Sequence, residues 1–406
     1  MYKTDINLIM ITPHGRSGSI FMQSLLDCHP EIASIPAFNL SYQLKKNSEN
    51  INDFIDKFID LNPDIFDTSL GYLGQINHNV TSLFGLEKNS HLKVNKFEFK
   101  KILVEKEFKD HILRNQDISR RDFWIGVHLA YLQLIGKDPE QVKYLVFQAH
   151  SYHLGDHHIA IEDFPDMYYI AMTRDPREDW LSWKKVTKIR DGWFHFATLD
   201  YHRFVCISEY AKAIRGLVTI RPCLSPGHLI LIDLNRLHEV NICGMRKLAS
   251  TLKIGFEESL LFSTFNGQIW EGNSADRKPV HGFDANKVRL NWRTELSSSE
   301  VDLISTSLNQ EIRILNYKML DVPSFSRLKY PIISSLVYNM MQLARGPRSN
   351  HLLFGKLPLG FMRLLRMLRF LISFPLLARR QIVEHRHRPT LRDTETNLNL
   401  SLETFL

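Results

Sequence analysis

The feature that most constrains this chain is a short, largely apolar run that passes straight into a glycine-rich turn. Residues 6–11 form the apolar run, the turn reads His14-Gly-Arg-Ser-Gly-Ser19, and apolar residues then recur at helical spacing from Phe21. A strand, a turn and a helix in this order place several backbone N–H groups around an anion at a helix N-terminus. The segment therefore predicts an anion-binding loop in an α/β fold, although an ordinary strand–helix turn has the same pattern.

The residues of the turn suit an anion. Gly15 and Gly18 allow a positive φ or a close approach of the backbone, and Arg16, Ser17 and Ser19 add a charge and two hydroxyl donors. The turn differs from the loop of nucleoside triphosphatases, which reads GxxxxGK[ST], because no lysine follows its second glycine. A P-loop phosphoryl-transfer kinase is therefore the less favoured enzyme class.

A second strand, turn and helix follow at residues 167–183. Tyr168–Met172 reads as a buried strand, an Asp-Pro pair turns the chain, and acidic residues suit the first turn of the helix that begins there. Arg174 lies at the strand end, and Ser182 follows eight residues later. Because a parallel sheet collects its loops at the carboxyl ends of its strands, we expect both side chains to converge on one anion beside the first loop.

The two segments together resemble the sulfotransferase family. Gly15-Arg-Ser-Gly-Ser19 is similar to its 5′-phosphosulfate loop, and Arg174-Asp-Pro-Arg177 with Ser182 is similar to its 3′-phosphate motif. The resemblance covers roughly residues 5–320. Four further family-like elements agree in order, namely Phe164-Pro165-Asp166, Leu229–Leu234, Trp270–Ser274 and Asn291–Ser297.

The resemblance implies transfer of a sulfuryl group from 3′-phosphoadenosine 5′-phosphosulfate (PAPS) to an acceptor hydroxyl, without a metal. It also implies a P-loop-like three-layer α/β sandwich, with a central parallel sheet and a helical insertion that shapes the acceptor site. We expect a sulfotransferase domain at residues 1–322, a basic, mostly helical amphipathic extension at 323–390 and a disordered tail at 391–406. A carbohydrate or glycolipid is the expected acceptor.

The resemblance also implies roles for individual residues, according to their positions in the matching motifs. Arg16 stands where it would neutralise charge on the leaving phosphate, and Phe21 where its ring would lie against adenine. Ile20 departs from the family, which prefers threonine there, so we expect weaker binding of the 5′-phosphate. Arg277 and Lys278 are similar to a basic pair in the family's late cofactor-closing loop. The residues expected to bind PAPS are Arg16, Ser17, Gly18, Ser19, Phe21, Arg174 and Ser182.

Sulfuryl transfer needs a group that takes the proton of the acceptor, and a histidine with a pKa near neutrality is suitable. Two patterns of the family place this histidine just after the strand that follows Lys143. One pattern selects His150 and the other selects His153, so both are candidates for the catalytic base. The lysine that accompanies the histidine in both patterns is replaced by Gln148 or Ala149, which removes an expected cation.

The same histidines could also be ligands of a metal ion. His150-Ser-Tyr-His153 and Asp156-His-His158 carry possible ligands, but no complementary cluster lies elsewhere in the sequence, so no metal is expected. The four cysteines show no paired spacing. Neither a zinc site nor a disulfide framework is therefore predicted.

Positive charge is concentrated near the C-terminus. The formal net charge is +7, yet residues 322–390 hold twelve basic residues and one acid, Glu384, so the body before them is nearly neutral. Arg363, Arg366 and Arg369 fall on one stripe of an otherwise apolar helix. This favours an anionic membrane surface as partner, with packing on the body, self-association or an anionic acceptor platform as alternatives. A nucleic-acid partner is not predicted, because the body lacks a basic stripe.

The sequence shows no signal peptide and no apolar stretch long enough to span a membrane, so we expect a cytoplasmic protein that is peripheral on the inner face of a membrane. The rival to an enzyme is a non-catalytic protein. Such a protein would bind PAPS or its product 3′-phosphoadenosine 5′-phosphate (PAP), or act as a membrane-associated interaction protein. Ile20 and the missing lysine motivate this alternative.

Overall fold

The computed structural model describes residues 5–13, 15–39, 51–67, 93–105, 112–114, 117–149, 154–191, 195–270, 282–284 and 290–320. These residues belong to two compact units. Unit 1 takes its residues from Met1–Arg174 and Arg215–Arg289, and unit 2 from Asp175–Ile214 and Leu290–Leu400. The predicted C-terminal extension and tail lie outside the described residues, so the domain boundary at residue 322 stays a prediction.

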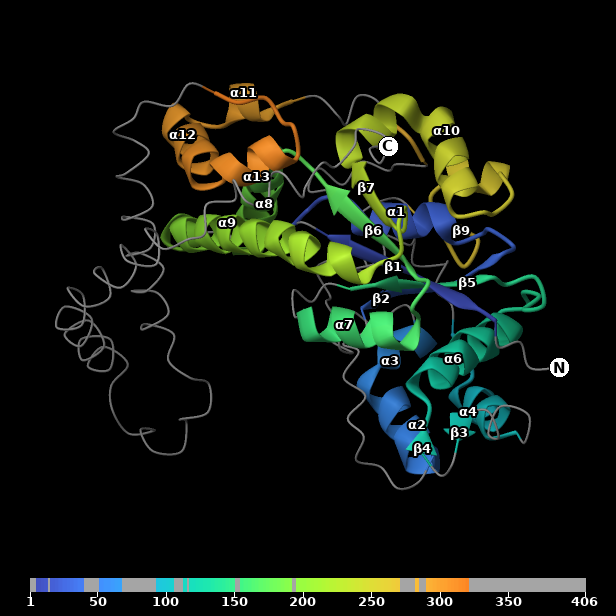
Figure 1. The fold of residues 1–406 in the computed structure, drawn as a ribbon. Coiled ribbons are helices and arrows are strands. Elements are labelled where there is room, and N and C mark those ends of the chain that lie inside the picture. The colour runs from blue at the N-terminus through green and yellow to red at the C-terminus, as the bar shows by residue number, and fades with distance from the viewer. Residues whose placement is uncertain are drawn as a thin grey trace, which may run out of the picture. The chain divides into compact units, whose positions relative to one another are not determined.

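Unit 1 is built on a five-stranded parallel sheet in the order β2-β5-β1-β6-β7 (Figure 1). The strands are mostly apolar, as is typical of strands that are buried on both faces of a sheet. The central strand β1 pairs with β5 on one side and with β6 on the other. The strands are β1 (Asn7–Pro13), β2 (Ile32–Asn39), β5 (Tyr144–Gln148), β6 (Tyr168–Thr173) and β7 (Leu229–Asp233).

Helices cover both faces of this sheet (Figure 1). On one face, Ile9 and its neighbours share a buried apolar cluster with α1 and α10. On the other face, Phe147 lies 5.1 Å from Trp124 of α6, and Tyr169 lies 5.7 Å from His157 of α7, between ring centroids. The prediction of an α/β fold with three layers is confirmed. The helices are α1 (Ser19–Leu26), α6 (Arg120–Leu134), α7 (Leu154–Asp163) and α10 (Leu234–Thr251).

A helical insertion separates β2 from β5 in the sequence, as predicted. Its first helix, Ile51–Leu61, buries one apolar face, and the Ser119 hydroxyl caps α6 by accepting from the Asp122 amide (3.3 Å). Aromatic rings hold the helices together, with Phe58 against both Phe99 and Phe123. Before α6, the insertion comprises α2 (Ile51–Leu61), α3 (Pro63–Phe66), α4 (Lys96–Val104), β3 (Leu113–Arg114) and β4 (Asp117–Ile118).

A two-stranded hairpin follows α10. Its turn is Asn266-Gly267, and both residues have positive φ, at 51° and 76°. This is the backbone that a two-residue hairpin of the type I′ class requires, and Asn-Gly is its preferred sequence. The remaining short elements of unit 1 are η4 (Arg221–Cys223), η5 (Glu258–Leu261), β8 (Thr264–Phe265) and β9 (Gln268–Ile269).

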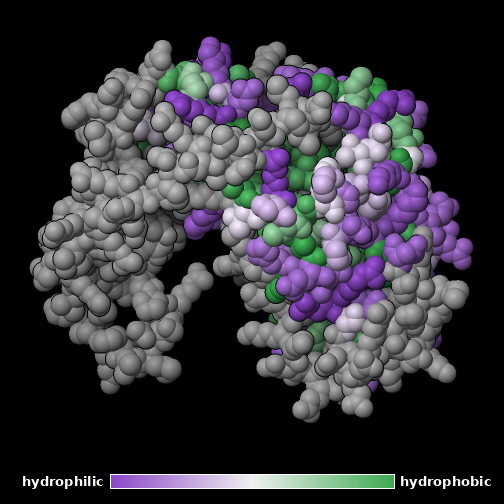
Figure 2. Space-filling view, viewed as in Figure 1, coloured by the Kyte–Doolittle hydropathy of each residue, from purple (hydrophilic) through white to green (hydrophobic). Residues whose placement is uncertain are grey.

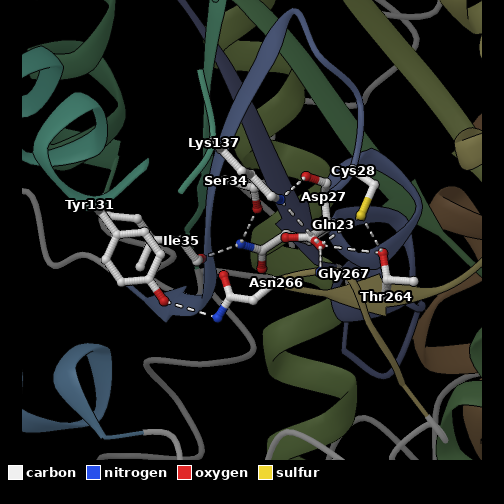
Figure 3. A network of polar contacts seen from close by, with 10 residues as sticks. All are labelled: Gln23, Asp27, Cys28, Ser34, Ile35, Tyr131, Lys137, Thr264, Asn266 and Gly267. Atoms are coloured by element: carbon white, nitrogen blue, oxygen red, sulfur yellow. Dashed lines mark hydrogen bonds and ion pairs between the residues drawn. The ribbon is translucent and has the colours of Figure 1, made fainter. Parts of the chain in front are cut away.

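A buried carboxylate fastens the end of α1 to this hairpin (Figure 3). Asp27 Oδ2 accepts from the Thr264 hydroxyl (3.2 Å) and the Gly267 amide (3.0 Å). The ammonium of Lys137 donates to the Asp27 carbonyl (3.1 Å) and lies 3.8 Å from Oδ2. Burial and the Asp27 charge together raise the pKa of the adjacent Cys28 thiol. The network holds the helix that begins at the glycine turn in a fixed place.

The described part of unit 2 is helical, and Glu300 links two of its helices. This residue forms a capping box with Ser297 at the start of α12. Its carboxylate also accepts from Trp180 Nε1 (3.1 Å) and Lys184 Nζ (3.0 Å). Burial alone would raise the pKa of Glu300, but these hydrogen bonds outweigh it and lower the pKa. The helices are α8 (Pro176–Asp191), α9 (His195–Ile220, which runs on into unit 1), α11 (Trp292–Glu295), α12 (Ser298–Ser307) and α13 (Asn309–Ile314).

Most of the described surface on the face in Figure 2 is hydrophilic, with smaller hydrophobic areas between. None of the described helices combines the length and the apolar composition that crossing a membrane requires.

Candidate phosphate-binding site

The turn between β1 and α1 has the backbone that its glycines predict. Gly15 has φ of 75° and Gly18 has φ of 85°, a left-handed region in which only glycine carries no steric penalty. Gly18 caps α1, and its carbonyl accepts from the Met22 amide (2.9 Å). Ser19 is the first residue of the helix. His14 lies outside the described residues.

Gly18 is also a position of close approach. A Cβ atom placed there would lie 2.5 Å from Cδ1 of Leu234, the first residue of α10. Since α10 begins directly after β7, the glycine turn packs against the end of another strand. The turn is thus fixed by the sheet as well as by its own backbone.

The carboxyl ends of the strands lie at one edge of the sheet. In the strand register, Pro13 of β1 is opposite Met172 of β6, and Ile11 is opposite Gln148 of β5. Arg174 follows the end of β6 directly and is partly buried. The structure therefore brings the glycine turn, with partly buried Arg16, and Arg174 to the same sheet edge, as the sequence predicts.

The remaining residues predicted to bind PAPS fall in two places. Ser17 is buried in the turn. Ser182 lies on α8, in unit 2. Its convergence with Arg174 on one anion stays a prediction.

Gln148, which is notable in the sequence only because it stands in place of an expected lysine, contacts the turn. Gln148 Nε2 donates a hydrogen bond to the Ser19 hydroxyl oxygen at 2.6 Å. The two residues are 1% and 4% exposed. No local pattern reveals this contact, because the partners are 129 residues apart in the sequence.

Phe21 is buried between other rings. It stacks on His238 of α10, with ring centroids 4.7 Å apart and an interplanar angle of 9°, and its edge meets Phe283 at 5.6 Å. His238 Nδ1 in turn accepts from the Asp284 amide (3.1 Å). Sequence reasoning did not identify His238. The predicted contact of Phe21 with adenine stays a prediction.

The second arginine of the Arg174–Arg177 motif stabilises the packing of unit 2. Arg177 is fully buried, and its Nε and Nη2 donate to the Asp175 carboxylate at 2.8 and 2.7 Å. Nη2 also donates to the Lys318 carbonyl (2.9 Å), and the guanidinium lies 4.3 Å from the centre of the Trp292 ring. A planar guanidinium suits such a bidentate and stacked site. The motif thus divides into a residue at the sheet edge and a residue in the helical core.

The candidate bases His150 and His153 lie outside the described residues, between β5 and α7. The same holds for Arg277 and Lys278. In the part of the chain that the structure describes, no group of three or more His, Cys, Asp or Glu side chains could hold a metal ion.

Fold and site together define a P-loop-like α/β protein. No protein-family model matches the sequence, and no curated protein matches it. Among solved structures, the chain is similar to the sulfotransferase domain from the curacin biosynthetic pathway, with 16% identity, a TM-score of 0.45 and coverage of 78% of this chain and 99% of that one.

Two further solved structures are similar. The sulfotransferase domain from the Synechococcus PCC 7002 olefin synthase has 15% identity, a TM-score of 0.44 and coverage of 78% of this chain and 98% of that one. A sulfotransferase from Mycobacterium avium has 13% identity, a TM-score of 0.39 and coverage of 78% and 79%.

Proposed function

We propose that this chain is a sulfotransferase that moves the sulfuryl group of PAPS to an acceptor hydroxyl. The observation that carries the proposal is the glycine turn before α1, which holds Arg16 at the same sheet edge as Arg174. Backbone amides at the start of a helix and two arginines suit a nucleotide with phosphates at both ends of its ribose. The absence of a lysine after Gly18 disfavours a nucleoside triphosphate.

The reaction assigns a task to each residue. The acceptor oxygen bonds to sulfur while the bond from sulfur to the bridging phosphate oxygen breaks, and PAP leaves with an added negative charge. Arg16 and the amides of the turn would stabilise that charge, as in phosphoryl transfer. The acceptor proton would pass to His150 or His153. Arg174 and Ser182 would bind the 3′-phosphate, and Phe21 would contact adenine.

A carbohydrate or glycolipid hydroxyl is the proposed acceptor. In the sequence, the helical insertion lies between the strand that precedes the turn and the strand that precedes the candidate bases, and its helices would supply contacts to the acceptor. Attachment of residues 323–390 to an anionic membrane surface would bring the enzyme to lipid-linked acceptors. This part of the proposal rests on the sequence alone.

Calorimetry with PAP tests the proposal, with ADP and Mg²⁺ as the comparison ligand. We expect PAP to bind and the magnesium nucleotide to bind more weakly. Incubation with PAPS and a panel of carbohydrate and glycolipid acceptors then tests transfer of labelled sulfate. Binding of PAP without transfer to any acceptor would favour the non-catalytic nucleotide-binding protein. If PAP does not bind, both the sulfotransferase and the non-catalytic nucleotide-binding protein are overturned.

A further inference from the structure

The contact between Gln148 and Ser19 joins the end of β5 to the first residue of α1. Gln148 is held rigidly, because it lies in the strand register opposite Ile11 and the next amide, that of Ala149, donates to the Ile11 carbonyl (2.9 Å). Ser19 is equally fixed at the start of α1. Groups placed on strands and helices are positioned more accurately than groups on loops. The contact is thus built into the framework of the site.

The direction of this hydrogen bond determines what Ser19 can do. A hydroxyl has one proton to donate and two lone pairs that accept, whereas an amide NH₂ only donates. Ser19 Oγ therefore accepts from Gln148 Nε2, and its own proton points elsewhere. Within the described part of the chain, that proton has no acceptor. A hydroxyl that already accepts a hydrogen bond is also a stronger donor, because hydrogen bonds in a chain polarise one another.

We propose that Gln148 is a positioning residue that orients the Ser19 hydroxyl as a donor to the 5′-phosphate end of the nucleotide. The inference rests on the proposed function, since it names what completes that anion site. Gln148 would act through Ser19 and would contribute no charge of its own. A well-oriented Ser19 hydroxyl would partly compensate for the hydroxyl that is missing at the next position, Ile20.

A series of variants at Gln148 tests the direction of the bond. Gln148→Lys keeps a donor, Gln148→Met removes it, and Gln148→Glu replaces it with a group that accepts the Ser19 proton. We expect PAP to bind to the lysine variant at least as tightly as to the wild type. The methionine variant should bind about three- to tenfold more weakly, and the glutamate variant more than about tenfold.

Adenosine 3′-phosphate, which has no 5′-phosphate, is the matched ligand. Its affinity should stay within about twofold in all three variants, which also shows that they fold.

Gln23→Met is the matched variant, because Gln23 lies on α1 like Ser19 but donates to the Ile35 carbonyl (2.7 Å), away from the turn. It should leave the affinity for PAP unchanged, and thermal melting should confirm that each protein is folded.

A double-mutant cycle tests whether Gln148 acts through Ser19. Once Ser19→Ala has removed the hydroxyl, Gln148→Met should cost no further affinity for PAP. Equal PAP affinity in the wild-type protein and in the methionine and glutamate variants would overturn the inference, as would equal losses for both ligands. Failure of the wild-type protein to bind PAP would instead overturn the proposed function.

Discussion

At the scale of single residues, the turn depends on a glycine that has no room for a side chain. Gly18 combines φ of 85° with the close approach of Leu234, whereas Gly227 has φ of 80° and no heavy atom within 4 Å of the point where a Cβ atom would lie. Both alanine variants should lose about 1 kcal/mol of unfolding free energy from the left-handed backbone. Gly18→Ala should lose about 1 kcal/mol more from overpacking.

Guanidinium unfolding measures both losses. The extra loss should shrink in the Gly18→Ala, Leu234→Ala double variant, judged against Leu234→Ala alone, because that substitution removes the clashing atoms. Equal losses in Gly18→Ala and Gly227→Ala would show that the contact with Leu234 costs nothing.

The two arginines of the Arg174–Arg177 segment should respond differently to substitution. Arg174→Ala should weaken PAP binding by about 1.5–3 kcal/mol, which is the scale of a hydrogen bond to a charged group. Arg177→Met should instead lower the unfolding free energy by about 3 kcal/mol, because it leaves the Asp175 carboxylate without its buried partner. Calorimetry and guanidinium unfolding separate the two effects, and an unchanged PAP affinity in Arg174→Ala would refute its assignment.

The choice between the two histidines can be made by activity. If His150 is the base, His150→Ala should abolish sulfate transfer while PAP affinity stays unchanged, because a base acts on the acceptor proton rather than on the donor. His153→Ala should then remain active. The reverse pattern would assign the base to His153.

At the scale of elements, α6 buries an imidazole against the sheet. His128 is fully buried, and burial lowers its pKa to about 4 from an ordinary value of 6.5. Between these two values the unfolded chain binds a proton that the folded chain does not. The unfolding free energy should therefore fall as the pH falls through this range, by about 3 kcal/mol in all.

Urea unfolding at several pH values between neutrality and pH 4 measures this loss. His128→Gln removes the titrating group and keeps a donor for the Trp124 carbonyl, which His128 Nδ1 contacts at 2.9 Å. The variant should lose less stability on acidification than the wild-type protein. Parallel curves for the two proteins would mean that another group is responsible.

Local elements of this fold could be predicted from the sequence, and contacts between them could not. The apolar runs of β1 and β6, the glycines of the turn and the cap of α6 are all local signals, and the structure has each of them. The contacts of Gln148 with Ser19 and of His238 with Phe21 join elements far apart in the chain. Propensity and periodicity describe neighbours along the chain, so they do not reveal such partners.

At the scale of the whole molecule, the positive charge is concentrated in residues 322–390, whereas the body before them is nearly neutral. This distribution favours separate roles for the two parts, with the nucleotide at the body and an anionic surface at the extension. If the basic extension binds membranes, truncation after Val322 should abolish pelleting with anionic liposomes and leave PAP affinity unchanged. Neutral liposomes are the control, because attraction to basic residues depends on lipid charge. Pelleting that persists after truncation would place the lipid contact elsewhere.

The strand order also has a consequence for how the protein is made. The first strand occupies the centre of the sheet, with Asn7 opposite Tyr144 and Ile9 opposite Tyr168. At ribosomal rates of about 5–20 residues per second, β1 waits roughly 10–30 seconds for its second partner. Until β6 has been made, one edge of this apolar strand lacks its native partner. A nascent chain that ends before β6 thus contains every residue of the glycine turn but lacks Arg174, the second arginine of the proposed anion site.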